Sequence, residues 1–416
     1  MDMKIVVGGT LIDGTGADPI ENAVIVIENE RIKEVGRKGE VSIPQGAQTI
    51  DAAGKTILPG LIEAHVHLWG AKTMNPHDWL IDPIGLCAIR SAVEAQRLLE
   101  AGYTSVRDLG SKIALDLKQA INEGSVPGPR IFAAGKCLSQ TAGHGDAHDL
   151  PMTWLVEKGW FGRMADGPDE FRKAAREQLR AGADFLKVMN TGGVMSEKDH
   201  PHWPQMTVEE TRAVVEEASN VNTIVATHAQ GTQGIKNGIK AGVKTIEHGI
   251  FLDDECIEMM LKKDVILVPT LSVIRNLARI GHKHGVPEYG VRKAKETSEI
   301  HFKNVQKAVA AGVTVAAGAD FLGPEMCKHG DNAMELGFLV EAGLTPMDAI
   351  VAGTRNSALA LGPRGLDLGT LEEGKLTDLL IVDGDPLKDI QVLQEPERIK
   401  VIMKGGKVVS RKFNHT

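Results

Sequence analysis

The sequence has few cysteines and aromatic residues, and it has no long hydrophobic run. Only four cysteines occur in 416 residues, and none belongs to a C-x-x-C pair. This spacing argues against a disulfide framework and against a thiolate zinc site. No stretch of about 18 consecutive apolar residues is present, so we expect no membrane-spanning helix. The first residues lack the cationic and apolar regions of a signal peptide, which predicts a cytoplasmic protein.

Positive charge is also scarce. The formal net charge is −8, and no dense Lys/Arg stretch interrupts the chain, so a nucleic-acid partner is not expected. The hydrophobic content of 42% is enough for a substantial core. A chain of 416 residues exceeds one average domain and suggests a large domain with a smaller one beside it.

Both ends of the chain are rich in β-forming residues. Short apolar runs separated by Gly and Asp turn residues predict strands near 4–12, 23–27, 377–382, 399–403 and 407–410. We therefore predict one composite β-sandwich domain, formed by residues 1–57 together with residues 364–416.

The middle of the chain alternates between helical and β patterns. Four predicted helices end in the same way, with a glycine that leads into a β run, at Gly102, Gly182, Gly242 and Gly312. Eight candidate strands follow, near 58–66, 103–108, 130–134, 184–189, 223–228, 244–248, 265–269 and 313–319. Eight βα units in succession predict an α/β fold of the (β/α)₈ TIM barrel type over residues 58–363.

Metal-ligating residue types recur at the ends of these predicted strands. Alternation along a strand places the two imidazoles of the doublet at 65 and 67 on one face. The carboxyl ends of barrel strands meet at one rim, where such folds keep their chemistry. The candidate ligands are His65, His67, Lys187, His228, His248 and Asp320.

Lys187 is the unusual member of this set, because a buried ammonium is costly and cations would repel it. It could pair with a carboxylate or reach toward water. It could also form a Schiff base with a carbonyl substrate, although five metal-type partners around it argue against that. A lysine that has reacted with carbon dioxide instead carries a carbamate, whose oxygens can bridge two metal ions.

These residues resemble the amidohydrolase superfamily along essentially the whole chain. The matching motifs are Pro59–His67, Lys187, His228, Glu247-His248-Gly249, Ala319-Asp320 and the terminal stretch Gly374–Pro386. The resemblance implies that His65, His67 and Asp320 hold the more buried metal ion, and that His228 and His248 hold the second. Carboxylated Lys187 and a hydroxide would bridge two divalent ions, usually Zn²⁺, although manganese, cobalt and iron also suit these ligands.

Within the superfamily, the chain is similar to Xaa-Pro dipeptidases and N-acyl amino acid carboxypeptidases, which are often labelled imidazolonepropionase-like. The segments 141–148 and 190–196 carry this similarity. True imidazolonepropionases use one metal and lack the bridging lysine, so Lys187 counts against that activity. We expect a hydrolase in which the bridging hydroxide attacks an amide carbonyl and Asp320 shuttles the proton.

Two alternatives remain open. The same binuclear site could hydrolyse a lactone, an organophosphate or a cyclic amide, because barrel loops choose the substrate. A non-catalytic scaffold would also keep the fold, but it predicts substitutions among the ligands, and none is present.

Several further residues are expected near the site. His144, Tyr289 and Gly193 are predicted to contact a small peptide-like substrate, with Tyr289 in a loop. Trp69 and Trp79 could form an apolar wall, and Arg107, Asp108, Thr270 and Ser272 follow strands 2 and 7 at the same rim. His200, His202, His282 and His284 are interpreted as solvated loop residues. By resemblance, the protein is expected to form a homo-oligomer.

Overall fold

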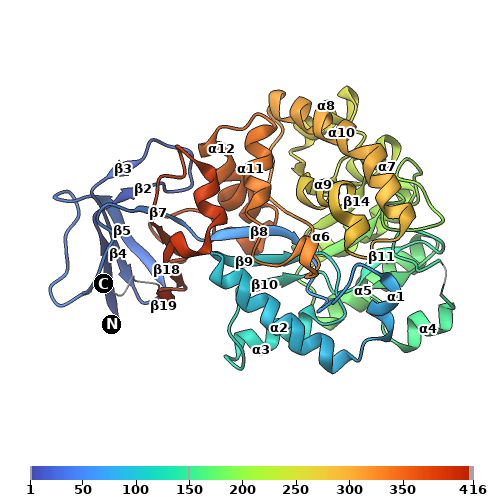
Figure 1. Ribbon diagram of the computed structural model, residues 1–416, viewed down its shortest axis with the longest axis horizontal. Coiled ribbons are helices and arrows are strands. Elements are labelled where there is room, and N and C mark those ends of the chain that lie inside the picture. Colours follow the sequence, from blue (N-terminus) through green and yellow to red (C-terminus); the bar gives the residue numbers. More distant parts are fainter. Residues whose placement is uncertain (1, 149, 412–416) are drawn as a thin grey trace.

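The computed structural model describes residues 2–148 and 150–411. The two ends of the chain form two sheets, at the left of Figure 1. One sheet has the order β5-β4-β1-β6 and the other β19-β18-β17-β7-β2-β3. The first contains β1 (Met3–Val7), β4 (Ala23–Glu28), β5 (Arg31–Arg37) and β6 (Gln48–Asp51). The second contains β2 (Thr10–Leu11), β3 (Ile20–Glu21), β7 (Thr56–Pro59), β17 (Leu379–Val382), β18 (Ile399–Lys404) and β19 (Lys407–Arg411).

These two sheets share apolar contacts. Val6 and Ile25 of one sheet and Leu379 and Val401 of the other belong to one buried cluster. β7 pairs antiparallel with β17, so the N-terminal and C-terminal segments are joined by backbone hydrogen bonds.

Parallel strands form the centre of the larger part of the molecule. One sheet has the order β10-β9-β8, and the other has the order β12-β11-β13-β14-β15-β16. The strands are β8 (Leu61–Val66), β9 (Tyr103–Asp108), β10 (Arg130–Ala133), β11 (Cys137–Ser139), β12 (Gly162–Met164), β13 (Leu186–Met189), β14 (Val225–Ala229), β15 (Thr245–His248) and β16 (Ile266–Val268). The registers Met189 to His228 and Ala229 to His248 bring consecutive strand ends to one edge. The predicted α/β class with parallel strands is confirmed.

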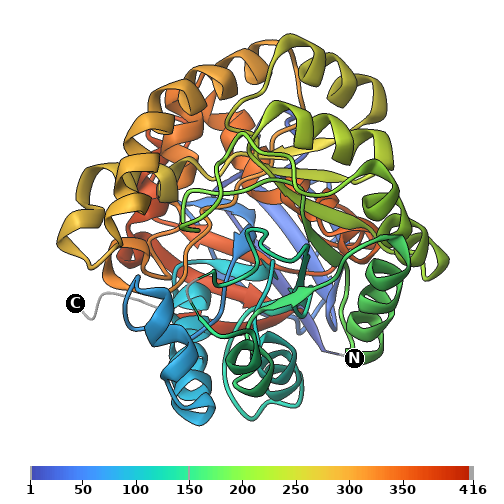
Figure 2. The same cartoon turned by 90° about the vertical axis from the view of Figure 1, so that its right-hand side faces the viewer.

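Helices surround these strands, as Figure 2 shows. They are α1 (Pro76–Ile81), α2 (Ile84–Glu100), α3 (Ala114–Asn122), α4 (Met152–Glu157), α5 (Pro168–Ala181), α6 (Val208–Asn220), α7 (Thr232–Ala241), α8 (Asp254–Lys263), α9 (Leu271–Ile280), α10 (Glu288–Ala310), α11 (Met334–Glu341), α12 (Pro346–Val351) and α13 (Ser357–Leu359). A π-helical turn at Ala352–Asn356 links the last two. Short 3₁₀ turns lie at Gly281–Lys283, Glu325–Cys327, Gly362–Gly365, Ile390–Gln394 and Pro396–Arg398.

The predicted helix-glycine-strand junctions are present at Gly102, Gly182 and Gly242, whereas Gly312 leads into an irregular segment. α5 and α7 end at Gly182 and Gly242, whose φ angles of 99° and 104° lie in the left-handed region that glycine adopts without strain. Thr207 caps α6 with a full capping box that includes Glu210.

The last predicted strand, 313–319, is not a regular strand. Its backbone hydrogen bonds are divided among several elements, which prevents an uninterrupted ladder. Ala316 N donates to Leu267 O of β16 at 2.9 Å, and Ala64 N of β8 donates to Ala317 O at 2.9 Å. Ala317 N donates to Ala352 O at 3.0 Å. The segment therefore lies between β16 and β8 and carries Asp320 at its end.

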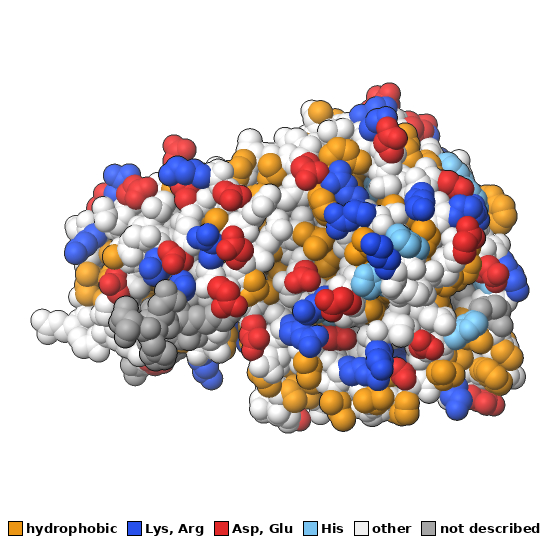
Figure 3. All heavy atoms as spheres, viewed as in Figure 1, with side chains coloured by type: hydrophobic (Ala, Val, Ile, Leu, Met, Phe, Trp, Pro, Cys, Tyr) orange, Lys and Arg blue, Asp and Glu red, His pale blue; other side chains and the backbone are white. Residues whose placement is uncertain are grey.

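The surface mixes charges of both signs, and apolar side chains gather along the lower edge in Figure 3, over α2. Ile84, Leu86, Ile89 and Val93 of this helix are exposed. Across residues 2–148 and 150–411, no helix has the length and apolar content needed to span a bilayer. All four cysteines are free and buried.

Candidate metal centre

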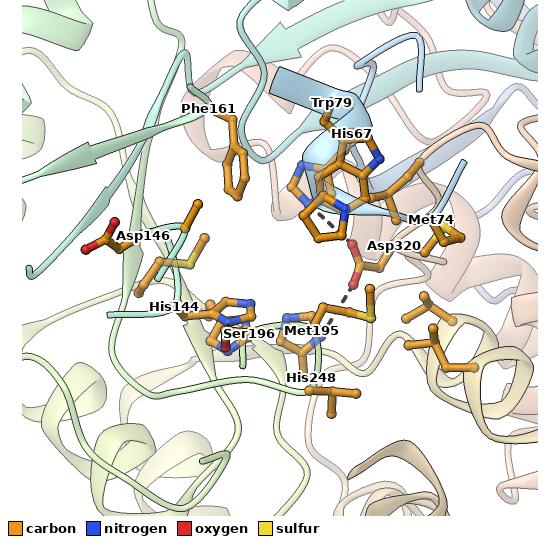
Figure 4. A pocket seen from close by; sticks show the side chains of 18 of the residues that line it. His67, Met74, Trp79, His144, Asp146, Phe161, Met195, Ser196, His248 and Asp320 are labelled. Carbon is orange, nitrogen blue, oxygen red and sulfur yellow. Dashed lines mark hydrogen bonds and ion pairs between the residues drawn. The ribbon is translucent and has the colours of Figure 1, made fainter. Parts of the chain in front are cut away.

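The carboxylate of Asp320 lies at the meeting point of three imidazoles. Its Oδ1 is 3.4 Å from His65 Nε2 and 3.3 Å from His67 Nε2, and its Oδ2 is 4.0 Å from His248 Nδ1. His65, His248 and Asp320 each offer a ligand atom within 4.8 Å of the other two. Figure 4 shows His67 and His248 directed toward Asp320 from opposite sides of the pocket. The sequence-predicted convergence of these residues is therefore present.

His228 and Lys187 complete the set of predicted ligands. The His228 ring lies 4.5 Å, between centroids, from the His248 ring on the neighbouring strand. Lys187 is buried on β13 and lines the same pocket. Burial lowers the pKa of its ammonium, while the charges of Glu247 and Asp320 act in the opposite direction. A lowered pKa increases the fraction of neutral amine, the form that reacts with carbon dioxide.

His65, in strand β8, and His67, directly after that strand, each have one ring nitrogen held by the protein. His65 Nδ1 lies 2.8 Å from Glu247 Oε2, and His67 Nδ1 lies 2.9 Å from the carbonyl oxygen of Gly110. Both acceptors require the Nδ1–H tautomer, which leaves the Nε2 lone pairs directed at Asp320. Metal-ligating histidines are held in the same way, by an acceptor on the far ring nitrogen.

The other two histidines show a similar arrangement. His248 Nδ1 lies 2.7 Å from the hydroxyl oxygen of Thr270, and His228 Nε2 lies 3.2 Å from the carbonyl oxygen of Gly192. Each ring therefore keeps its second nitrogen for another partner. Four imidazoles with one nitrogen fixed and one available fit a metal centre better than a hydrogen-bonded core.

The electrostatics of the site also suit cation binding. Burial lowers the pKa of His65, His228 and His248 well below the usual range, so these imidazoles are neutral. Burial alone would raise the pKa of Asp320, but the charge of Lys187 is among the causes that lower it below its usual value. Neutral imidazoles and an ionised carboxylate are the protonation states that a divalent ion requires.

A buried ion pair supports the His65 side of the site, and sequence reasoning assigned no role to its acidic member. Arg107 Nη2 donates to Glu247 Oε1 at 2.7 Å, and both side chains are fully buried. Arg107 also donates to the carbonyl oxygens of Ala64 and Ala360 at 2.6 and 2.9 Å. Glu247 thus connects the guanidinium to the His65 imidazole. The available signal for this role was the position of Glu247 in the Glu-His-Gly motif, directly before the predicted ligand His248.

Three residues of the site have left-handed backbone conformations. The φ angles are 72° at His248, 53° at Thr270 and 58° at Asp320. This region is unfavourable for residues with a Cβ, and it is most strained for a β-branched residue such as threonine. Such outliers cluster at functional sites, where the surrounding structure holds them.

The pocket that contains these ligands has an aromatic wall. Trp69 lies 4.6 Å from Trp79 and 4.5 Å from Phe161 between ring centroids, and Trp160 lies 4.6 Å from Phe161. The other apolar lining residues are Met74, Pro76, Ala147, Met189, Val194, Met195, Val273, Ile274, Leu277 and Leu322. The two tryptophans singled out in the sequence line the pocket, and Trp160 and Phe161 were missed.

The remaining predicted contacts fall in different places. His144 and Tyr289 line the pocket. Tyr289 lies in the first turn of α10, so its placement in a loop was wrong. Gly193 lies behind the His144 ring, because a Cβ there would approach His144 Cε1 to 2.1 Å. Asp108 accepts hydrogen bonds from the backbone nitrogens of Leu68 and Gly110, at 2.7 and 3.0 Å, beneath the site.

Ser272 and the four loop histidines lie outside the set of residues that line the pocket. Ser272 donates from its backbone nitrogen to Glu335 Oε2 at 2.8 Å, away from the four imidazoles. Among the residues that the structure describes, the pocket lining includes none of His200, His202, His282 and His284.

The chain is similar to known proteins in sequence and in fold. The Amidohydrolase family profile matches residues 56–409. An ochratoxinase from Aspergillus niger is 37% identical over 427 aligned positions, which cover 98% of this chain and 86% of that protein. The crystal structure of A. niger ochratoxinase has a TM-score of 0.90 and 35% identity, with 98% of this chain and 95% of that chain covered.

Two further crystal structures are similar over nearly their whole length. A prolidase complexed with N-methylphosphonate-L-proline has a TM-score of 0.91 and 35% identity, covering 99% of this chain and 100% of that chain. A Xaa-Pro dipeptidase with methionine bound in its active site has a TM-score of 0.87 and 35% identity, covering 98% of this chain and 99% of that chain.

Proposed function

This chain belongs to the amidohydrolase family, and on that premise we propose that it cleaves the amide bond of a dipeptide or an N-acyl amino acid. The observation that carries the proposal is the convergence of His65 and His67 on Asp320, each with Nδ1 already held and Nε2 facing the carboxylate. That arrangement leaves ligand atoms aimed at one point, which suits a metallohydrolase.

Two divalent ions, Zn²⁺ by family resemblance, would be held by the predicted ligands. His65, His67 and Asp320 would hold the more buried ion, and His228 and His248 would hold the other. Carboxylated Lys187 would bridge them. When bound, such ions acidify water and polarise a carbonyl group. The donor set, of neutral imidazoles with oxygen ligands, fits zinc chemically.

The residues of the chain would divide the remaining work. Asp320 would accept the proton of the attacking water and deliver it to the leaving nitrogen, so one carboxylate serves both steps. Its lowered pKa supports the first step, because an ionised carboxylate is the competent base. His144, at the pocket wall, would contact the substrate, and Tyr289 would lie at the other side of the entrance.

The pocket lining supports an apolar substrate. Four aromatic rings and the facing aliphatic side chains suit a large apolar side chain or an aromatic acyl group beside the scissile bond. The names of the similar proteins, prolidase, Xaa-Pro dipeptidase and ochratoxinase, favour amide substrates. A small peptide-like molecule is therefore the proposed substrate.

We also propose a two-domain architecture for the chain. Residues 58–363 would form a closed (β/α)₈ barrel, supported by the hydrogen bonds of segment 313–321 to both β8 and β16. Residues 1–57 and 364–416 would form a β-sandwich domain, supported by the apolar cluster common to both terminal sheets. A cytoplasmic homo-oligomer is proposed by resemblance, and the exposed apolar side chains of α2 favour an assembly.

The test is hydrolysis by the purified, metal-loaded protein. Xaa-Pro dipeptides, N-acyl amino acids with apolar side chains, lactones and an organophosphate would be assayed in parallel, with metal content measured on the same samples. We expect turnover of at least one amide series and loss of that turnover on chelation. Hydrolysis of lactones or organophosphates alone, or no turnover with two metals bound, would refute the proposed function.

A further inference from the structure

A hydrogen-bonded chain of buried side chains lies behind His144. His144 Nδ1 lies 2.7 Å from Ser196 Oγ, and Ser196 Oγ lies 2.5 Å from Asp199 Oδ1. Gln205 Nε2 donates to Asp199 Oδ2 at 2.9 Å, and the backbone nitrogen of His144 donates to Gln205 Oε1 at 2.8 Å. The chain therefore begins and ends on His144. None of these partners belongs to the predicted ligand set.

The direction of each hydrogen bond follows from the acceptor at the end of the chain. Burial alone would raise the pKa of Asp199, but the hydrogen bonds from the Ser196 hydroxyl and the Gly193 backbone and the charge of Lys293 are among the causes that lower it. An ionised carboxylate only accepts, so Ser196 must donate its single proton to Asp199. The serine oxygen can then only accept from His144, which places a proton on Nδ1. The opposite ring nitrogen, Nε2, is the one left for the pocket that His144 lines.

A buried lysine holds the loop that carries Ser196 and Asp199. Lys293 Nζ, on α10, donates to the carbonyl oxygens of Gly193, Ser196 and Asp199 at 3.1, 2.6 and 2.6 Å. Its ammonium is also 3.6 Å from Asp199 Oδ1, and both side chains are 3% exposed. A compact cation with three donors suits three converging carbonyls, which a planar guanidinium cannot match. α10 thus fixes the backbone of residues 193–199.

The His144 ring has little freedom in this position. One of its faces stacks on the His228 ring, with centroids 4.2 Å apart. A Cβ at Gly193 would approach His144 Nδ1 to 2.3 Å, so the glycine permits this close approach. The network therefore has a single ring orientation to hold.

We propose that Asp199, acting through Ser196, and Lys293, acting through the 193–199 backbone, are positioning residues that hold His144 in the Nδ1–H tautomer with Nε2 toward the substrate. This rests on the proposed function, in which His144 contacts the substrate. The inference adds two buried charges from outside the metal ligands to the machinery of the reaction.

The test is a set of double-mutant cycles with His144. Asp199→Asn, Ser196→Ala and Lys293→Met would each be made alone and together with His144→Ala, and kcat and KM would be measured for the best amide substrate. Each single variant is expected to lower kcat/KM by roughly 10–100-fold, as losses of outer hydrogen-bond partners do. In the His144→Ala background the same changes should cost less than about 2-fold, because their target is gone. Metal content should stay at the wild-type value.

Lys295→Met is the matched control, because Lys295 is exposed on the same helix. It should leave kcat/KM within about 2-fold of wild type. Equal losses in both backgrounds would show a general structural role and would overturn the proposal. If Lys293→Met does not fold, the cycles of Ser196→Ala and Asp199→Asn decide the outcome alone.

A second measurement does not need activity. ¹⁵N-histidine NMR of the full chain at pH 8, assigned with His144→Gln, should show a protonated Nδ1 and an unprotonated Nε2 at His144. Asp199→Asn should lose this signature, and a protonated Nε2 in the wild type would overturn the proposal. If no amide is hydrolysed but the tautomer is as stated, the proposed function fails while the positioning stands. If an amide is hydrolysed but each variant causes the same loss with and without His144, the proposed function stands and the positioning proposal fails.

Discussion

Glu247 connects buried Arg107 to the candidate metal centre, and its replacement by glutamine should lower both the stability of the fold and the affinity for metal. Its Oε1 neutralises Arg107 at 2.7 Å, and its Oε2 accepts from His65 Nδ1 at 2.8 Å. A glutamine has one carbonyl oxygen, so it can serve one of these donors and must turn its NH₂ toward the other. Either way a fully buried guanidinium loses the carboxylate that neutralised its charge. Breaking a buried ion pair on one side costs about 3–5 kcal/mol.

Two measurements separate the consequences of Glu247→Gln. Urea unfolding of the metal-free protein, followed by tryptophan fluorescence, should show a free energy of unfolding lower by about 3–5 kcal/mol. Competition with a chromophoric chelator should show metal affinity weaker by roughly 10–100-fold, because His65 loses its tautomer-fixing acceptor. Glu258→Gln, at an exposed position of α8, is the control and should stay within about 0.5 kcal/mol. Unfolding and metal affinity both at wild-type values would refute this reasoning.

Three further predictions follow from the same site and its surroundings. Asp320→Asn should keep its metal and lose roughly 10²–10⁴-fold in kcat, because asparagine tolerates left-handed backbone but cannot accept and return a proton; wild-type kcat with metal bound would contradict this. Metal content, measured by elemental analysis, should depend on added bicarbonate in the wild type and should not depend on it in Lys187→Met. Full metal loading of the wild type without bicarbonate would contradict the carbamate. Burial raises the pKa of Glu94 from 4.5 to about 8, so the folded protein keeps a proton that the unfolded chain releases. Stability should therefore fall as the pH rises from about 4.5 to 8, and Glu94→Gln should flatten this fall in urea midpoints at pH 5 and 8.5, whereas parallel profiles would argue against it.

The sequence predicted the features that depend on local pattern. The β-rich ends, the glycine junctions at 182 and 242, and the polar residues at strand ends follow from periodicity and turn chemistry. The meeting of His65 and Asp320 was expected from the predicted barrel topology, which would bring the last unit beside the first.

The features that the sequence did not predict depend on long-range partners. Lys293 reads as one of several lysines on a polar helix, and nothing local indicates that three carbonyl oxygens from residues 193–199 surround it. Trp160 and Phe161 lie in a loop whose path is set by tertiary contacts. The segment 313–321 has the sequence pattern of a strand. Its irregular backbone depends on hydrogen bonds to elements far away in the chain, which the pattern does not reveal.

The left-handed backbone at His248, Thr270 and Asp320 limits how far this protein can be made heat-resistant. Each of these conformations costs on the order of 1–3 kcal/mol, and glycine would relieve that cost while removing a side chain of the candidate metal centre or the Thr270 hydroxyl beside it. Directed evolution for survival at high temperature, without a screen for turnover, should therefore accumulate glycine or asparagine at these three positions. It would yield robust but inert proteins, so the two traits must be selected together.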